Sequence, residues 1–387
     1  MSQEPAWFVR MPASHERALD ALLRRGRLRA LEAPHGIDFT SNDYLGLAQS
    51  PELANAVLQA IERGVPVGAG GSRLLRGNHP EHEALECEAA AFFGAETALF
   101  FGGGYVANTA LLATLPARGD LIVYDSLIHA SFHDGMRLSK ASTAQALHND
   151  PQSFEDSIKS WRNGGGSGQP WIVIESLYSM DGDRAPIDDI AKLARRYDAM
   201  LIVDEAHATG VFGAHGRGLA AHLEGSADVI TVHTCGKALG VMGALVLAPR
   251  IIRDFLVNRA RAFIYATAPS PLIAAAVRAA LEICQKEPQR REKLHRLISF
   301  KDEDLKSKTH FVPSRSQIQP IIVGSDAAAV ALASAMKARG YDIRAIRPPT
   351  VPEGTARLRL TVTLHADETH LSRLVADLAA AEAEIAA

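Results

Sequence analysis

The stretch DVITVHTCGKALG, residues 228 to 240, joins a short run of β-branched residues to a lysine that is surrounded by small residues. A run of this kind is typical of a strand buried in a parallel sheet. Lys237 follows the end of that strand, and open α/β sheets bind ligands beyond the carboxyl ends of their strands. A partly desolvated lysine has a lowered pKa, so its neutral amine can form a Schiff base with a carbonyl group. The stretch therefore predicts an α/β fold with a reactive lysine at the edge of its sheet.

Five further segments with strand character flank this stretch. They are TALFF (97–101), LIVY (121–124), WIVIE (171–175), MLIVD (200–204) and GALVL (243–247). Between them lie segments with helical periodicity, such as residues 187–199 and residues 79–94, where Gly94 can take the left-handed cap position. This alternation predicts an α/β fold with a mainly parallel sheet.

The pattern changes near residue 285, after which shorter elements follow. Strand-like segments are 318–323, 341–346 and 357–363, and helical segments are 326–340 and the alanine-rich C-terminus. These elements predict a smaller α+β domain. The expected organisation is an N-terminal helix and arm (1–45), a large α/β domain (46–285) and a small C-terminal domain (286–387). We expect the N-terminal helix, around residues 14–31, to pack with the small domain.

The composition is that of a soluble globular protein. With 387 residues, of which 47% are hydrophobic and 22% charged, the chain is long enough for two lobes with separate cores. Its formal net charge of -3 provides no basic field for nucleic acid or an anionic membrane, and its apolar runs are too short to span a bilayer. The N-terminus is polar and mixed in charge, unlike a signal peptide, so we expect a cytoplasmic protein.

Neither the cysteines nor the histidines form a recognised metal-binding motif. Cys87, Cys235 and Cys284 lie far apart without a CxxC pair, which argues against disulfides and a thiolate zinc site. The segment around His79 and His82 lacks the HExxH spacing that places two imidazoles on one helical face. We therefore expect no metal.

Two glycine-rich stretches are candidates for anion binding. GAGGSR (68–73) and FGGGYVAN (101–108) both lack the spacing of GxGxxG and GxxxxGK[ST]. FGGGYVAN follows a predicted strand and opens a helical run, so backbone N–H groups and the positive helix end would face an anion at the sheet edge. The alternative is that these glycines serve only a tight turn.

The segment LIVDEAHATGVFG (201–213) places two more polar groups at the same edge. Asp204 ends a predicted strand and His207 follows three residues later. Taken alone, Asp204 could be a helix cap and His207 a satisfied core histidine. Together with Lys237 and the anion site, however, they supply what pyridoxal phosphate requires: an amine for its aldehyde, a carboxylate for its ring nitrogen and an anion site.

The chain resembles the α-oxoamine synthase family of fold-type I pyridoxal-phosphate enzymes. The resemblance covers nearly the whole chain and rests on FTSNDYLGL (39–47), GAGGSRLLRGN, FGGGYVAN, DSLIHAS, SMDGD, VDEAHATG, TCGKALG and AIRPPTVPEGTARLRL (345–360). It implies a large domain with a mainly parallel sheet, a smaller α+β C-terminal domain and pyridoxal 5'-phosphate as cofactor. It also implies a homodimer with shared active sites.

The resemblance implies roles for the residues that match the family's cofactor site. Lys237 would form the Schiff base, Asp204 would pair with the ring nitrogen and His207 would hydrogen-bond the phenolic oxygen. His129 in DSLIHAS would stack on the cofactor ring. Further cofactor contacts would come from Gly104, Tyr105, Ser179, Thr234 and, in the neighbouring subunit, Thr267.

The substrate site is implied in the same way. Arg359 in RLRL would hold a substrate carboxylate, and Thr350 in RPPT would line the site. Asn42 and His129 are also expected to contact substrate. An N-terminal arginine contacts substrate in this branch of the family, and among the arginines of RRGRLRAL we choose Arg29.

Three positions differ from the family's usual pattern without removing a chemical group. They are Arg76, Tyr105 and Cys235. By the two-residue period of a strand, Arg357 shares a face with Arg359. A solvated sheet edge is the alternative for both arginines.

The segment RPPTVPEGTARLRL most resembles the branch that makes a biotin precursor. The implied activity is an acyltransferase reaction, a decarboxylative condensation of L-alanine with a pimeloyl thioester of coenzyme A or acyl-carrier protein. Glycine-using members, 2-amino-3-ketobutyrate ligase and 5-aminolevulinate synthase, share these motifs and stay open as alternatives. A binding protein that lost the chemistry, which would be colourless, and an aminotransferase, which would release no carbon dioxide, are two others.

Overall fold

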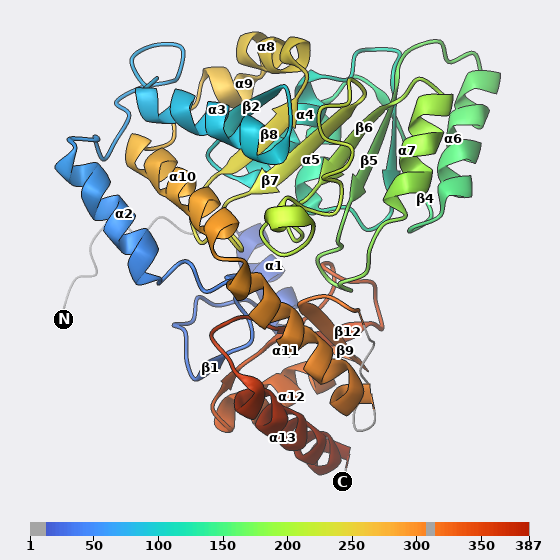
Figure 1. Ribbon diagram of the computed structural model, residues 1–387. Helices are drawn as coiled ribbons and strands as arrows, with labels where there is room; N and C mark the ends of the chain where they lie inside the picture. Colours follow the sequence, from blue (N-terminus) through green and yellow to red (C-terminus); the bar gives the residue numbers. More distant parts are fainter. Residues whose placement is uncertain (1–12, 307–313, 387) are drawn as a thin grey trace, which may run out of the picture.

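The structure is a computed structural model that describes residues 13–306 and 314–386. Its main feature is a seven-stranded sheet (Figure 1), with strand order β2-β8-β7-β6-β5-β3-β4. The strands are β2 (Thr97–Phe101), β3 (Leu121–Asp125), β4 (Ser142–Ala146), β5 (Pro170–Glu175), β6 (Met200–Asp204), β7 (Val229–Thr234) and β8 (Ala244–Ala248). Only β8 runs antiparallel to its neighbours, so the predicted α/β fold with a mainly parallel sheet is confirmed.

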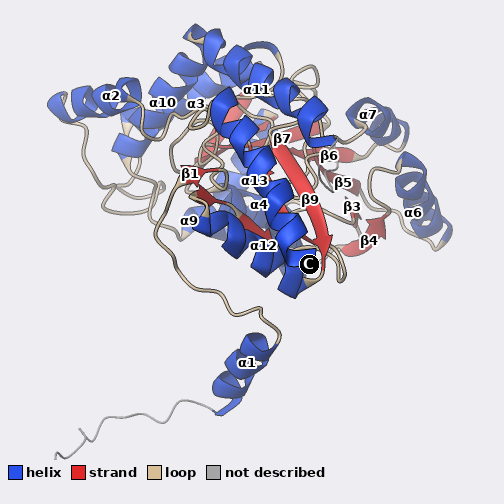
Figure 2. Cartoon of the chain, turned by 90° about the horizontal axis from the view of Figure 1, so that it is seen from below, coloured by secondary structure: helices blue, strands red, loops and turns tan. Residues whose placement is uncertain are grey.

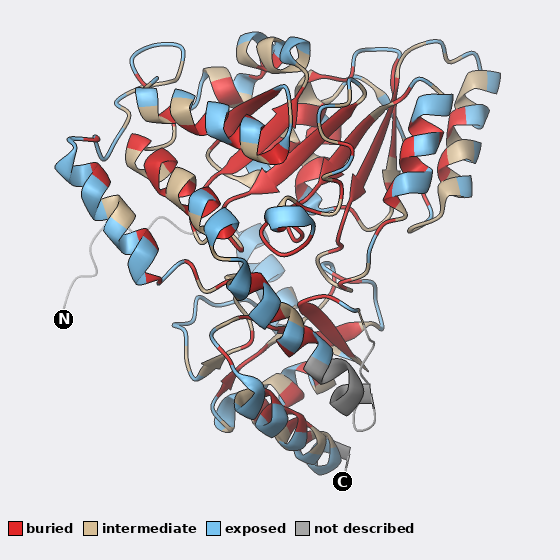
Figure 3. Cartoon of the chain, in the orientation of Figure 1, coloured by how far each residue is buried: buried red, intermediate tan, exposed pale blue. Residues whose placement is uncertain are grey.

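The sheet is covered by helices on both faces. They are α3 (Pro80–Phe93), α4 (Gly104–Thr114), α5 (Ala130–Leu138), α6 (Pro151–Asn163), α7 (Ile187–Arg196), α8 (Arg250–Arg259), α9 (Arg261–Ile264) and α10 (Pro271–Lys286). Side chains of β2 alternate between the hydrophobic cores on the two faces of the sheet, because successive side chains of a strand point to opposite faces. Ala98 and Phe100 belong to the core with α3 and α10, and Leu99 and Phe101 to the core with α4. Figure 3 shows the central strands buried between these layers.

In this part of the chain, one feature was predicted from the sequence and one was missed. Gly94 ends α3 with a left-handed φ of 88°, as predicted for that cap position. The edge strand β4 was missed because its sequence, STAQA, is polar and its side chains are mostly exposed. A polar edge strand lacks the apolar signal that identified the other strands.

The rest of the chain forms smaller sheets and helices, most of which lie below the large sheet in Figure 1. The elements are β1 (Ile37–Asp38), α2 (Pro51–Glu62), a short 3-10 helix (Ala214–Gly216), α11 (Pro288–Lys306), β9 (Ile318–Gly324), α12 (Asp326–Ala338), β10 (Tyr341–Asp342), β11 (Arg344–Ile346), β12 (Ala356–Thr361) and α13 (Glu368–Ala386). Strands β11, β12 and β9 form an antiparallel sheet. The strand expected over 341–346 is divided at Ile343, because β10 pairs with β1 whereas β11 pairs with β12.

The N-terminal helix differs from expectation. Helix α1 (Ala13–Arg24) ends before Gly26 and has no buried residue, and Figure 2 shows it standing apart from the other elements. The prediction that this helix packs with the C-terminal elements is therefore wrong. The arm after it makes the contact instead, since Arg27 forms ion pairs with Asp326 and Glu353. Within the described ranges, no helix is long and apolar enough to span a bilayer.

Candidate active site

Several polar residues lie together where the parallel strands end. Glu175 ends β5, Asp204 ends β6, and Lys237 lies three residues beyond the end of β7. Glu175 and Asp204 are paired in register across neighbouring strands, and Asp204 is paired with Val232 of β7. The carboxyl edge of the sheet therefore gathers these groups, as the strand order requires.

Lys237 begins a chain of buried polar contacts. Its Nζ lies 2.6 Å from Nε2 of His207, whose Nδ1 lies 2.6 Å from the hydroxyl of Tyr44. Burial lowers the pKa of Lys237 to about 8, against the opposing charges of Asp204 and Glu175. Burial and the nearby lysine hold the pKa of His207 well below its usual value. The arrangement therefore contains a neutral imidazole beside an amine that can be neutral near physiological pH.

Asp204 is held in one orientation by two N–H donors. Its Oδ2 accepts a hydrogen bond of 2.7 Å from Asn108 Nδ2, and its Oδ1 accepts one of 2.8 Å from the backbone of Ala206. Asn108 lies on α4 and also donates to Ser131 Oγ at 3.1 Å. A buried carboxylate that is fixed in this way can meet a protonated ring nitrogen in a defined geometry.

His129 lies at the start of α5 as its N-cap residue. Its Nδ1 lies 2.8 Å from Ser131 Oγ, which fixes the ring orientation. Burial lowers the pKa of His129, and the Lys237 charge acts in the same direction. The ring is therefore a neutral aromatic surface beside the cavity that it helps to line.

The start of α4 is open to an anion. Its N-cap, Gly103, provides no side-chain hydrogen bond to the first turn. A Cβ built on Gly104 would lie 3.5 Å from Thr234 Oγ1, whereas the positions above Gly102 and Gly103 are open space. Uncapped N–H groups at a helix start, next to a hydroxyl, form a site suited to phosphate.

Arg359 is a buried cation in β12. Its Nε donates to the carbonyl of Ser179 at 2.6 Å, and its Nη2 donates to Asn42 Oδ1 at 3.1 Å. Among the described residues, no carboxylate lies within ion-pair distance of this guanidinium. Arg357 is also buried and pairs with Asp181, so the solvated-edge alternative is wrong for both arginines. The Arg359 guanidinium is thus available to a carboxylate from outside the chain.

A cavity of about 520 Å³ brings four of the predicted site residues together. Arg29, His129, Ser179 and Thr350 all line it, and Arg29 Nη2 lies 3.4 Å from Thr350 Oγ1. Thr267 does not line this cavity and is exposed. These four residues therefore meet from both parts of the chain, whereas Lys237, Asp204 and Arg359 are also outside the lining of this cavity.

Tyr105 meets the ring of His129 edge-on, with centroids 6.2 Å apart, but does not line the cavity. Its side chain is 49% exposed, and its hydroxyl donates to Asp134 rather than toward Lys237. Only its backbone, in the first turn of α4, faces the proposed anion site.

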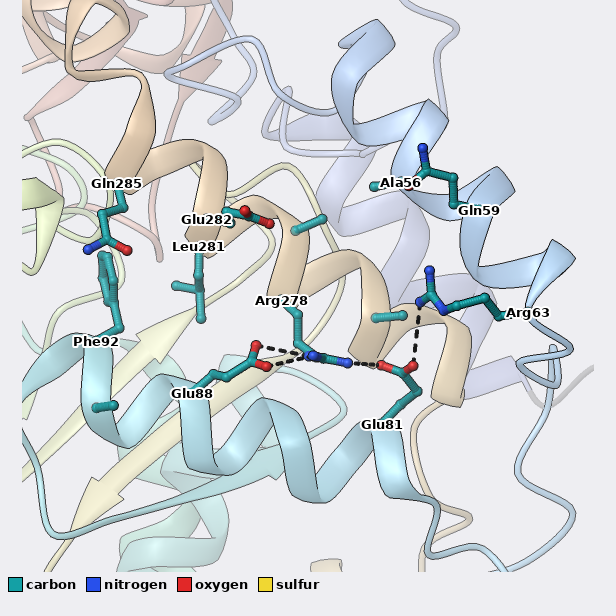
Figure 4. A pocket seen from close by; sticks show the side chains of 13 residues that line it. Ala56, Gln59, Arg63, Glu81, Glu88, Phe92, Arg278, Leu281, Glu282 and Gln285 are labelled. Atoms are coloured by element: carbon teal, nitrogen blue, oxygen red, sulfur yellow. Dashed lines mark hydrogen bonds and ion pairs between the residues drawn. The ribbon is translucent and has the colours of Figure 1, made fainter.

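A larger cavity of about 730 Å³ lies between α2, α3 and α10 (Figure 4). There Arg278 pairs with Glu81 and Glu88, and Arg63 lies 3.6 Å from Glu81. Each charged residue of this cavity has a partner of opposite charge, including Glu282, which pairs with Lys286. Within the ranges described, no cluster of three potential metal ligands occurs, and the three cysteines are free.

Three site residues were missed from the sequence. Tyr44 lies in the quoted stretch FTSNDYLGL, but its contact with His207 joins residues 163 positions apart. Asn108 lies in FGGGYVAN, of which only Gly104 and Tyr105 were predicted as cofactor contacts. Glu175 ends the strand WIVIE, and the rule that placed Asp204 at a strand end could have found it.

Comparison with known proteins agrees with this geometry. Residues 34–378 match the family described as aminotransferase class I and II. The chain is 43% identical to the 8-amino-7-oxononanoate synthase of Chromobacterium violaceum, over 92% of this chain and 94% of that protein. It is 41% identical to the enzyme of the same name from Geobacter sulfurreducens, over 88% and 87%.

Solved structures share the fold. The 8-amino-7-oxononanoate synthase of Francisella tularensis matches with a TM-score of 0.77 and 28% identity, over 91% of this chain and 99% of that chain. The serine palmitoyltransferase of Sphingomonas wittichii matches with a TM-score of 0.86 and 26% identity, over 97% of each chain.

Proposed function

The chain belongs to the class I and II aminotransferase family, where it groups with 8-amino-7-oxononanoate synthases, and from this premise we propose the reaction and the role of each site residue. The enzyme condenses L-alanine with a pimeloyl thioester of coenzyme A or acyl-carrier protein. A bond forms between the alanine Cα and the thioester carbonyl carbon, and the thiol leaves. The alanine carboxylate departs as carbon dioxide, which gives 8-amino-7-oxononanoate, a biotin precursor.

The residues at the sheet edge fit pyridoxal 5'-phosphate. Lys237 offers an amine, Asp204 a fixed carboxylate, and the uncapped start of α4 with Thr234 a phosphate site. When bound, pyridoxal phosphate supplies an aldehyde that bonds an amine and a ring that accepts the electron pair released at Cα. We assign the phosphate contacts to Gly104, Tyr105 and Thr234.

The chain's own residues control the proton and the orientation of substrate. Neutral Lys237 takes the Cα proton of alanine on its Nζ, and the neutral ring of His207, beside it, has one N–H that donates and one nitrogen that accepts a hydrogen bond, so it does not compete as a cation. The charge of Asp204 would keep the cofactor's ring nitrogen protonated. His129 would cover the face of the ring, and Ser179 lines the same cavity as His129.

The observation that carries the amino-acid specificity is the buried guanidinium of Arg359, which has no carboxylate partner within the described chain. A substrate carboxylate would satisfy it with two parallel hydrogen bonds, and Asn42 already orients it. Arg29 and Thr350 meet across the same cavity and are assigned to the thioester substrate. A glycine-using reaction stays the second candidate, because glycine carries the same carboxylate.

We also propose a cytoplasmic homodimer that shares its active sites. Thr267 supports this arrangement, because it is exposed and can therefore contact a second chain. In the dimer, Thr267 would reach the phosphate in the neighbouring subunit.

The test is product analysis by mass spectrometry. Purified protein with added cofactor is incubated with a pimeloyl thioester and either L-alanine or glycine. We expect the 8-amino-7-oxononanoate mass with alanine, carbon dioxide release, and no product from Lys237→Ala. Product from glycine alone would transfer the assignment to the glycine-using branch, and wild-type turnover in Lys237→Ala would contradict the role of the lysine.

A further inference from the structure

Two loops line the 520 Å³ cavity, and the bases of both contact the same histidine. The loop 126–129 follows β3 and includes His129, whereas the loop 178–181 follows β5 and includes Ser179. His148 lies just beyond β4 and does not line the cavity itself. It touches a carboxylate at the base of each loop.

The first contact is with the loop that holds His129. Nδ1 of His148 lies 2.8 Å from Oδ1 of Asp125, which ends β3 and is fully buried. The same carboxylate accepts hydrogen bonds from the backbone of Leu127 at 2.8 Å and of Asn149 at 2.7 Å. Asp125 therefore joins His148 to the first residues of this loop.

The second contact is with the loop that holds Ser179. Nε2 of His148 lies 2.8 Å from Oδ2 of Asp183, which also accepts a 2.6 Å bond from Asn149 Nδ2. The backbone of Asp183 accepts a 2.9 Å hydrogen bond from Tyr178, which closes the turn between them. The position of Asp183 thus determines where Ser179 lies.

The electrostatics make this bridge cationic. Burial lowers the pKa of His148, but hydrogen bonds and the charges of Asp125 and Asp183 outweigh it and raise the pKa to about 10. The groups that face the ring are those two carboxylates, Tyr178, whose ring meets it edge-on with centroids 4.5 Å apart, and the Asn149 amide, whose Nδ2 lies 3.2 Å from Nε2 and donates to Asp183. Both ring nitrogens are therefore N–H donors, each to a carboxylate.

We propose that His148 is a positioning residue that holds the two cavity-lining loops at the spacing needed for the thioester substrate. Only its kinetic consequence rests on the proposed function. The contacts of His148 do not include Lys237, Asp204 or the start of α4, so the amine and the phosphate site should not depend on it, whereas the positions of His129 and Ser179 should.

The kinetic test compares His148→Gln with a matched control. His222→Gln removes a histidine that also pairs with an aspartate, Asp188, at 2.6 Å, but on the surface and away from the cavity lining. We expect His148→Gln to raise the KM for the pimeloyl thioester by about tenfold and to change kcat by less than about threefold, because mispositioned loops weaken substrate binding first. His148→Gln should still retain bound cofactor, because Lys237 and the start of α4 are unchanged, and His222→Gln should change neither constant.

Two measurements decide the proposal without turnover. Nitrogen-15 NMR of the wild type should show His148 with both ring nitrogens protonated at mildly alkaline pH, and hydrogen exchange in His148→Gln should speed up at residues 126–129 and 178–183 but not in β6 or β7. A neutral His148, or unchanged exchange in both loops, would overturn the proposal. If the wild type makes no product from alanine and pimeloyl thioester, the proposed function fails, and these two measurements still decide the role of His148. The proposed role of His148 would also be overturned if the loops of His148→Gln exchange faster while its KM for the pimeloyl thioester is unchanged.

Discussion

Lys237 shows how burial alone can prepare a side chain for chemistry. In the part of the chain that the structure describes, no carboxylate is in hydrogen-bond contact with its amine, which lies against the imidazole of His207. Desolvation therefore outweighs the charges of Asp204 and Glu175, and it lowers the pKa of Lys237 to about 8.

The first prediction concerns the pH dependence of this amine. Because a protonated amine cannot attack an aldehyde, capture of pyridoxal phosphate by the apoprotein should speed up about tenfold per pH unit below the pKa of Lys237 and level off above it. With the pKa lowered to about 8, the levelling should occur near pH 8. Stopped-flow absorbance across the pH range measures this rate, and Lys237→Ala provides the control. A rate that keeps rising to the usual pKa of a lysine would contradict the burial argument.

The second prediction concerns the charge of Asp204. Asp204→Asn preserves the size of the side chain, and the backbone of Ala206 can still donate to its Oδ1. The variant lacks the charge that keeps the ring nitrogen protonated, so exchange of the alanine Cα proton should fall by at least about a hundredfold. Proton NMR of L-alanine in heavy water measures this exchange. Exchange at the wild-type rate, with cofactor bound, would show that another group supplies the charge.

At the scale of single elements, β12 carries two arginines on one face with different partners. Arg359 contacts neutral oxygens of Ser179 and Asn42, whereas Arg357 is paired with Asp181. Both side chains are buried, at 7% and 4% exposure. The strand thus presents one unpaired cation and, two residues away, one neutralised cation.

The third prediction uses this contrast. Arg359→Lys keeps the charge but loses the planar fork, so the affinity for L-alanine should fall about tenfold or more. Arg357→Lys is the matched control in the same strand, and its alanine affinity should stay within about threefold of the wild type. Spectral titration with L-alanine measures both. Equal affinity in the wild type and Arg359→Lys would place the carboxylate site elsewhere.

The elements that could be predicted from the sequence are those with a local hydrophobic pattern. Buried strands such as β6 and β7 have continuous apolar runs, and the ends of these runs placed Asp204 and Lys237 correctly at one edge. The polar edge strand β4 carries no such run and was missed. The split between β10 and β11 was also missed, because it depends on which strand pairs with each half.

The residues of the site could likewise be predicted only where the sequence carries a local signal. Residues at strand ends, and residues inside motifs shared with the family, could be named from the sequence alone. The contact of Tyr44 with His207 could not, and neither could the bridge from His148 to Asp125 and Asp183, because they join distant positions through side chains. Pairings of this kind depend on the finished fold rather than on local propensity.

At the scale of the whole molecule, the substrate cavity depends on both parts of the chain. His129 and Ser179 come from loops of the seven-stranded sheet, whereas Thr350 comes from the segment between β11 and β12. Gln317 also donates a 2.7 Å hydrogen bond to the carbonyl of His207, which connects the small sheet to the lysine's neighbour. Relative movement of the two parts would therefore change the cavity and the environment of Lys237 together.

The last prediction tests whether the active site also needs a second chain. If Thr267 binds phosphate in its own subunit, a hybrid of Lys237→Ala and Thr267→Glu subunits has a defect in each site and no activity. If Thr267 acts in the neighbouring subunit, one site of the hybrid combines an intact Lys237 with an intact Thr267, whereas both defects fall in the other. Random pairing makes about half of the dimers hybrids, each with one working site, so the mixture should recover about a quarter of wild-type activity.

The hybrids are prepared by co-expressing the two variants with different affinity tags and purifying on both tags, which leaves only mixed dimers. Each homodimeric variant, assayed alone, is the control and should be inactive, because glutamate at position 267 places a like charge beside the phosphate. The doubly tagged fraction should then show about half of the wild-type specific activity, since one of its two sites is complete. An inactive doubly tagged fraction would assign Thr267 to its own subunit. If no protein carrying both tags can be purified, the chain does not form the proposed dimer. The exposed Thr267 would then have no route to the chemistry through a second chain.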